Sequence, residues 1–148
     1  MTYLFCGDPH GRFEHIFEQV RQNRPIAIIL LGDLDLPQSF ETAFEPILDL
    51  TELWFIYGNH DTDNEHCYDH LFHSVLSDRT IADFIARCGK GNRWRGGLTL
   101  KHRSSIFPDD LELFKDQKAD ILVCHEAPVA HPHGFAAIDD LADSLGVK

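Results

Sequence analysis

The stretch LFCGDPHGRF, residues 4–13, joins an apolar run directly to turn-forming and acidic residues. The run TYLFC (2–6) is typical of a short buried strand, and residues 13–23 place apolar side chains at helical spacing. A strand followed by a helix is therefore expected. Asp8 and His10 then lie in the turn between the two elements, where a sheet presents its polar groups.

The same arrangement recurs along the chain. IAIILL (26–31) is a continuous aliphatic run typical of a strand covered on both faces. LWFIYG (53–58) and ADILVC (119–124) repeat the strand pattern. A second helical segment is predicted within 40–50, where Pro46 limits its regularity. Four apolar strands that each end in polar residues predict an α/β domain.

The polar residues after these strands are candidates for one shared site. In open α/β sheets, ligands bind outside the carboxyl ends of parallel strands, where several loops meet. Carboxylate, amide and imidazole ligands suit Mn, Fe or Zn. Two such ions, about 3.5–4 Å apart, commonly serve hydrolysis or group transfer at phosphorus or a carbonyl. The residues expected to meet are Asp8, His10, Asp33, Asn59, His60 and His125.

Each of these short patterns also has a purely structural interpretation. An Asp-x-His after a strand is more often a turn or a cap, and Gly-Asp is a common helix-entry turn. GNHD can be a turn with Gly at a special backbone angle, and His125 can be a strand-end histidine. The occurrence of all four patterns in order, each after a predicted strand, favours the site.

Four motifs resemble the first four motifs of the calcineurin-like metallophosphoesterases: GDPHG (7–11), GDLD (32–35), GNHD (58–61) and LVCHEAP (122–128). The resemblance extends from Thr2 to about Val147 and is weak between residues 78 and 108. It implies an α/β/β/α sandwich of two sheets flanked by helices. It also implies two divalent ions at the strand ends, Mn, Fe or Zn, with Mn favoured.

The resemblance implies a role for each metal ligand. Asp8 and His10 would hold the first ion, and Asp33 would bridge both ions. Asn59 and His125 would hold the second ion.

A catalytic mechanism is implied as well. A hydroxide held between the ions would attack a phosphomonoester or phosphodiester in line. His60 would be the general acid that protonates the leaving oxygen. Asp61 would either orient that imidazole or cap the turn.

One motif of the family is absent. No Gly-His-x-His occurs in the 148 residues, and 134–146 is instead predicted to form an amphipathic helix that ends at Gly146. The expectation is a chain that is incomplete at its C-terminus, with partial metal occupancy. His131 and His133 could substitute as ligands, although an exposed loop rim is the favoured interpretation. The alternative function is a catalytically weak family member that keeps the fold and some metal binding.

Two further segments stand out. Six of the thirteen Lys and Arg residues lie within 87–103, a stretch without an acid. Together with Arg12, the pair Arg93 and Arg95 could contact a substrate phosphate, although a solvated loop is slightly favoured. HCYDHLFH (66–73) places three histidines on one helix face, which is expected to be a solvent-facing edge.

Composition excludes several classes of protein. A length of 148 residues with 43% hydrophobic content predicts one domain, spanning 1–148. The net charge of −11 disfavours bulk binding of nucleic acid. No run approaches the roughly 20 apolar residues of a membrane span, so a cytoplasmic protein without membrane association is predicted. The expected substrate is a phosphorylated small molecule, a nucleotide or a phosphoprotein, and an oligomer is compatible with the sequence.

Overall fold

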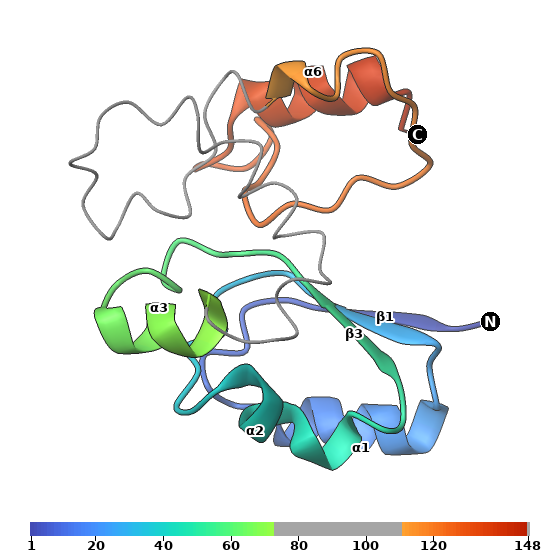
Figure 1. Cartoon of the computed structure of the whole chain (residues 1–148). Coiled ribbons are helices and arrows are strands. Elements are labelled where there is room, and N and C mark those ends of the chain that lie inside the picture. The colour runs from blue at the N-terminus through green and yellow to red at the C-terminus, as the bar shows by residue number, and fades with distance from the viewer. Residues whose placement is uncertain (73–110, 148) are drawn as a thin grey trace.

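The computed structural model describes residues 1–72 and 111–147. Figure 1 shows the course of the chain. The elements are β1 (Tyr3–Cys6), α1 (Glu14–Asn23), β2 (Ala27–Leu30), α2 (Phe40–Phe44), the 3-10 helix η1 (Glu45–Ile47), β3 (Glu52–Phe55), α3 (Glu65–Phe72) and α6 (Ala136–Leu145).

The three strands form one parallel sheet in the order β1-β2-β3. Phe5 pairs with Ile29, and Ile29 pairs with Trp54. All four residues of β2 are buried, which confirms the strand predicted from the continuous aliphatic run in 26–31. Because the strands are parallel and start in register, their carboxyl ends lie at the same edge of the sheet.

Helices α1 and α2 cover one face of the sheet (Figure 1). The helix predicted in 13–23 is confirmed, with Ile16 and Val20 buried. The predicted irregular segment is also confirmed, because α2 passes into η1 at Pro46. The buried core lies between the sheet and these helices. Phe40 is fully buried in it, with its ring centroid 4.7 Å from that of Phe44 and 4.8 Å from that of Phe55.

The prediction of a strand in 119–124 is wrong. The structure assigns no strand to these residues, and the Ala119 N–H donates to the carbonyl of Leu145 at the end of α6 rather than to a strand. Ile121 is 66% exposed. An apolar run becomes a strand only where a neighbouring edge accepts its backbone groups, and the sequence pattern does not reveal whether that edge is present.

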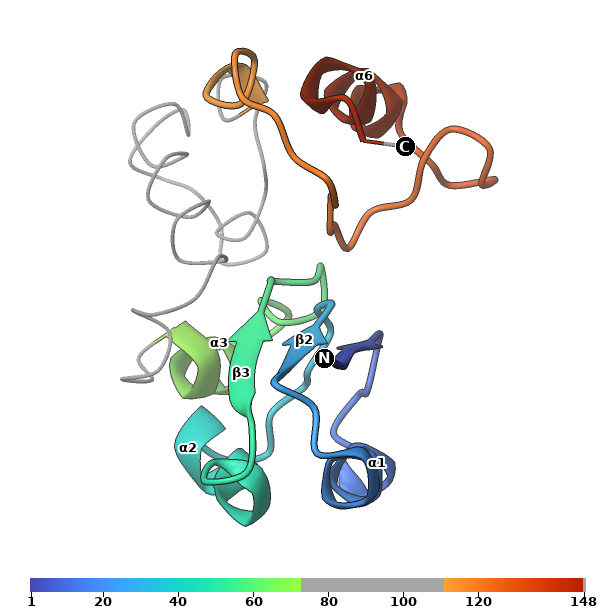
Figure 2. The same cartoon turned by 90° about the vertical axis from the view of Figure 1, so that its right-hand side faces the viewer.

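The predicted C-terminal helix is confirmed as α6. It ends at Gly146, which adopts a left-handed conformation with φ of 77° and donates its N–H to Ala142 and Asp143. In both views α6 lies on the side of the sheet opposite α1 and α2 (Figures 1 and 2).

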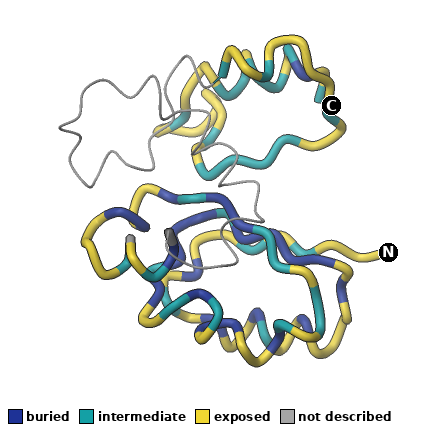
Figure 3. The backbone as a smooth tube through the Cα atoms, viewed as in Figure 1, coloured by how far each residue is buried: buried dark blue, intermediate teal, exposed yellow. Residues whose placement is uncertain are grey.

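The fold class is α/β, as predicted. Buried residues concentrate in the sheet and its helices, whereas residues 111–147 are mostly exposed or half-buried (Figure 3). The second sheet that the resemblance implies is not among the elements of the described ranges 1–72 and 111–147. Within those ranges, no helix has the length and apolar character needed to span a bilayer.

Candidate metal centre

The loops that follow β1 and β2 are joined to each other beyond the ends of the strands. The His10 N–H donates to the carbonyl of Asp33 at 3.0 Å, and the Gly11 N–H donates to the carbonyl of Leu34 at 2.9 Å. These bonds continue the parallel pairing into the loops. Asp8 and His10 are therefore brought beside Asp33 although they are separated by a whole helix in sequence.

The backbone of these loops is unusual. Asp8, His10, Asp33 and Asp35 all have positive φ angles, between 45° and 53°. Among the described residues, Arg24 at the end of α1 is the one further non-glycine residue with a positive φ angle. Left-handed backbone is uncommon outside glycine and tends to collect at functional sites, where surrounding contacts hold it.

Two glycines allow the loops after β2 and β3 to approach closely. Gly32 has a φ of +91°, and a Cβ on it would lie 2.6 Å from the Gly58 nitrogen and 2.8 Å from His125 Nδ1. A Cβ on Gly58 would lie 2.1 Å from Asp33 Oδ1. Neither position can hold a side chain without displacing a residue of the candidate site.

Asp33 is at the centre of the arrangement. It is 4% exposed, and its Oδ1 accepts the backbone N–H of His60 at 2.8 Å. Its Oδ2 lies 3.9 Å from His10 Nε2 and 3.5 Å from His125 Nε2. One carboxylate oxygen therefore lies within 4 Å of two imidazole nitrogens, which come from segments far apart in the sequence.

His125 is held in one orientation. Its Nδ1 lies 2.8 Å from the carbonyl oxygen of Leu31, so this nitrogen carries a proton. In the neutral ring Nε2 is then an acceptor, yet it faces the Asn59 Oδ1 at 2.9 Å and the Asp33 Oδ2 at 3.5 Å. A cation or a charged ring would satisfy acceptors that converge in this way. The residues present thus fit a bound metal ion.

The geometry supports a mixed oxygen and nitrogen ligand set. Asp8, Asp33 and His125 each offer one ligand atom within 4.8 Å of the others. His10 and Asn59 adjoin this group through their contacts with Asp33 and His125. The structure therefore brings together all five residues predicted as metal ligands. Such a donor set suits Mn, Fe or Zn.

The His60 imidazole lies on the exposed side of the group. Its ring centroid is 5.7 Å from that of His10, and its Nδ1 lies 2.5 Å from Asp63 Oδ2. The sequence motifs do not indicate a role for Asp63. Its position three residues after His60, on the same turn, is the signal that could have identified it.

Asp61 occupies a different position. Its buried carboxylate accepts backbone N–H groups from Asp33, Leu34, Asp35 and Gly58. Burial raises the pKa of Asp61 and the charge of Asp33 adds to that rise, while the backbone donors oppose it. Of the two roles that the sequence left open for Asp61, these contacts favour holding the turn.

Several other predicted residues lie apart from the group. His131 and His133 contact each other, with ring centroids 5.8 Å apart, in a turn closed by the carbonyl of Pro128. They are not among the residues of the candidate ion group. Arg12 is exposed in the loop after β1, and Arg93 and Arg95 lie outside the described residues.

The histidines of α3 belong neither to the candidate metal centre nor to the His131–His133 pair. The rings of His66 and His70 meet edge to face with their centroids 3.8 Å apart, and His70 Nδ1 lies 2.9 Å from the carbonyl oxygen of Leu36. His66 is exposed and His70 is half-buried, so the predicted solvent-facing edge holds in part. His73 lies outside the described residues.

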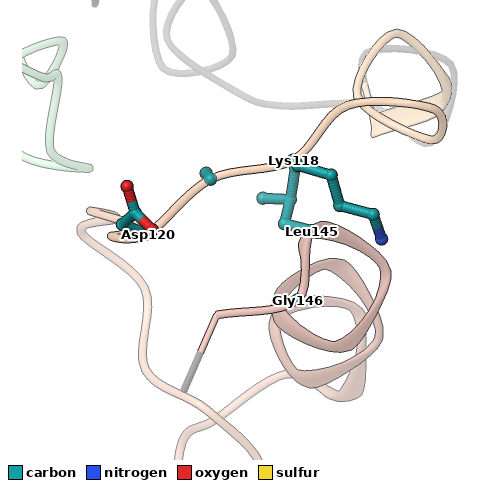
Figure 4. Close-up of a pocket in the computed structure, with 5 residues that line it drawn as sticks. Lys118, Asp120, Leu145 and Gly146 are labelled. Atoms are coloured by element: carbon teal, nitrogen blue, oxygen red, sulfur yellow. The ribbon is translucent and has the colours of Figure 1, made fainter.

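A shallow pocket elsewhere does not coincide with this chemistry. It is lined by residues 118–120 with Leu145 and Gly146 at the end of α6 (Figure 4). Lys118 donates to the carbonyl of Ser144 and so binds the helix end. None of the lining residues belongs to the candidate metal centre.

Comparison with known proteins agrees with the geometry. The model of the calcineurin-like phosphoesterase family matches residues 1–148, and the chain belongs to this family. At family level, this implies metal-dependent hydrolysis of phosphoesters.

A protein from Haemophilus influenzae, described as uncharacterized, is 36% identical over 180 residues, covering 98% of this chain and 79% of that relative. Since this alignment is longer than the chain itself, the relative carries residues with no counterpart here. No solved structure matches the chain significantly.

Proposed function

We propose that the chain hydrolyses a phosphomonoester or phosphodiester at a centre of two divalent ions. Asp8 and His10 hold the first ion, Asn59 and His125 hold the second, and Asp33 bridges them. The observation that carries the proposal is that Asp33 Oδ2 lies within 4 Å of both His10 Nε2 and His125 Nε2. A bridging carboxylate needs this placement.

The protein environment favours cations at this point. Asp33 and Asp61 are both buried and lie close together, so two carboxylates are shielded from water at the same end of the sheet. Uncompensated buried charge of one sign is unfavourable. When bound, two divalent ions neutralise charge on phosphoryl oxygens and make water a stronger nucleophile. The mixed donor set suits Mn, Fe or Zn, and of these Mn is the ion that the family resemblance favours.

His60 serves as the general acid. With Nδ1 held by the Asp63 carboxylate, the charged ring presents Nε2–H as the proton that can pass to the leaving oxygen. Imidazole exchanges a proton near neutral pH, which suits this role. Its exposed position beside His10 leaves room for an ester to approach.

A second candidate function is a family member with weak metal binding and little activity. The observation that favours it is the absence of a Gly-His-x-His motif from the sequence. About three protein ligands for each ion would then remain. Three protein ligands still support catalysis in known metal sites, so we favour the enzyme.

The deciding experiment measures hydrolysis of phenyl phosphate and diphenyl phosphate, whose leaving groups need a proton, with and without Mn²⁺, alongside metal counting. The variants are Asp33→Ala, His60→Ala and the exposed control Asp49→Asn. Turnover that depends on Mn²⁺ and is lost in both Ala variants, but not in the control, supports the enzyme. Equal background rates in all four proteins would support the weak family member. A nucleotide and a phosphopeptide then test the substrate class.

A further inference from the structure

The contact between Asp35 and His10 has no role in the assignments made so far. Asp35 Oδ2 lies 2.7 Å from His10 Nδ1, although the two residues are 25 positions apart. Asp35 comes from the loop after β2, and His10 comes from the loop after β1. This is a short charge-assisted hydrogen bond between the two loops that form the site.

The backbone on both sides of this contact is fixed. Asp35 has a φ of 47°, and its N–H donates to Asp61 Oδ1 at 3.3 Å. His10 has a φ of 45°, and its N–H donates to the carbonyl of Asp33. Both residues are thus held in an uncommon conformation by bonds that do not involve their side chains. The fold places the carboxylate and the imidazole opposite each other.

The contact determines which nitrogen of His10 carries the proton. A carboxylate accepts only, so the neutral ring bonded to Asp35 has its proton on Nδ1 and an open lone pair on Nε2. Nε2 is the atom that faces Asp33 Oδ2, at 3.9 Å. Asp35 and Asp33 are therefore alternative acceptors for the single proton of the neutral His10 ring. The proton is on Nδ1, because Asp35 Oδ2 is 2.7 Å from Nδ1, whereas the 3.9 Å between Nε2 and Asp33 Oδ2 is beyond hydrogen-bond length.

We propose that Asp35 is a positioning residue that keeps the proton of His10 on Nδ1 and so leaves Nε2 open to a metal ion. The proposal rests on the proposed function for the role of His10 as a ligand. Without Asp35, the Asp33 carboxylate would be the nearest acceptor and would attract the proton to Nε2, at the point where an ion must bind.

The primary test is the tautomer of His10 in the metal-free protein. Long-range ¹H–¹⁵N correlation spectra at about pH 8, where a free imidazole is neutral, report the protonation of each ring nitrogen. The His10 signals are assigned by their loss in His10→Gln. Wild type should show Nδ1–H and unprotonated Nε2. Asp35→Gly keeps the left-handed backbone, removes the carboxylate and should move the proton largely to Nε2.

Two further variants make the test specific. Asp35→Asn keeps a weaker acceptor at the same place and should give a mixture of tautomers, which also covers the case in which Asp35→Gly does not fold. Asp63→Asn is the matched control, because its carboxylate contacts His60 instead. It should alter the His60 signals and leave those of His10 unchanged. An unchanged His10 tautomer in both Asp35 variants overturns the proposal.

Metal affinity gives an independent readout. Loss of a carboxylate that orients a histidine ligand weakens metal binding by roughly 10–100-fold, so titration calorimetry with Mn²⁺ should show that loss in Asp35→Gly and not in Asp63→Asn. A tautomer shift without phosphoesterase activity in any protein leaves this proposal standing and refutes the proposed function. Phosphoesterase activity in wild type, together with an unchanged His10 tautomer in the Asp35 variants, refutes this proposal and leaves the proposed function standing.

Discussion

The buried carboxylate of Asp61 accepts a hydrogen bond from the backbone N–H of Asp33 at 3.0 Å. The same carboxylate accepts the N–H groups of Leu34, at 2.7 Å, and Gly58, at 2.8 Å. It therefore ties the loop after β2 to the loop after β3. Since Asp33 has left-handed backbone, this tie sets the direction in which the central carboxylate of the site projects.

Asp61→Asn should destabilise the protein strongly. An amide offers one acceptor oxygen, and its NH₂ group would face backbone N–H groups that also donate. We expect the free energy of unfolding to fall by about 2–4 kcal/mol. Urea unfolding in EDTA measures this without a contribution from bound metal. Asp49→Asn, at an exposed position, should change stability by less than about 0.5 kcal/mol. Equal stability of the two variants would contradict the role of Asp61.

Gly32→Ala should disturb both stability and the site. The substitution combines a side chain at φ of +91° with a Cβ 2.6 Å from the Gly58 nitrogen. Left-handed backbone and overpacking together should cost about 2–4 kcal/mol. The matched control is Gly7→Ala, because a Cβ there meets nothing within 4 Å. If urea unfolding gave the same free energy for both alanine variants, the close approach of the two loops would not be required.

The sequence predicted the sheet because its signals are local. The aliphatic run in 26–31 predicts a central strand, and the rule that ligands bind at the converging strand ends predicts that Asp33 lies near His10. The same reasoning failed for 119–124, since a strand needs a partner that the run itself does not encode. His125 nevertheless reaches Asp33 from this segment, without a strand to carry it.

The carboxylates that orient the histidines could not be predicted in the same way. The contact between Asp35 and His10 depends on left-handed backbone at both residues and on bonds between two loops. Such conformations are set by tertiary contacts rather than by residue type alone. Asp61 shows the related difficulty, because a carboxylate beside a histidine in sequence proves to contact the backbone instead.

His60→Asn should reduce turnover most for esters whose leaving group is basic and must be protonated by a general acid. Loss of proton donation typically costs about 10²–10⁴ in rate, and phenyl phosphate, with its basic leaving group, should show this loss. Hydrolysis of p-nitrophenyl phosphate releases p-nitrophenolate, which needs no protonation, so its rate should fall far less. Mn²⁺ affinity should stay unchanged, and His15→Asn on α1 serves as the control. Equal losses with both esters would argue against proton transfer by His60.

Cys124 should react slowly at neutral pH. Burial raises the pKa of its thiol, and the negative charge of Glu126 adds to that rise. Alkylation proceeds through the thiolate, so its midpoint should lie above the value of about 8.5 for a free thiol. Glu126→Gln should lower the midpoint only in part, because burial is the larger cause. Mass spectrometry of the Cys124 peptide against pH measures both, and a midpoint at or below that of a free thiol would contradict the prediction.

Asp33→Asn should change stability in opposite directions with and without metal. In EDTA the wild type holds two buried carboxylates, and the charge of Asp33 acts against that of Asp61. The asparagine removes this repulsion and still offers an oxygen to the His60 N–H, so the variant should be at least as stable as wild type. In Mn²⁺ at about 100 times the dissociation constant, wild type should gain about 2.7 kcal/mol, and the variant should gain little.

Urea unfolding in the two buffers distinguishes a ligand from a merely structural residue. A structural aspartate would leave the variant weaker than wild type by the same amount in EDTA and in Mn²⁺. A metal ligand makes the order of stability reverse between the buffers, because the charge that is unfavourable in the empty protein becomes favourable when a cation is bound. Parallel losses in both buffers would remove Asp33 from the metal centre, and with it the bridge on which the proposed chemistry depends.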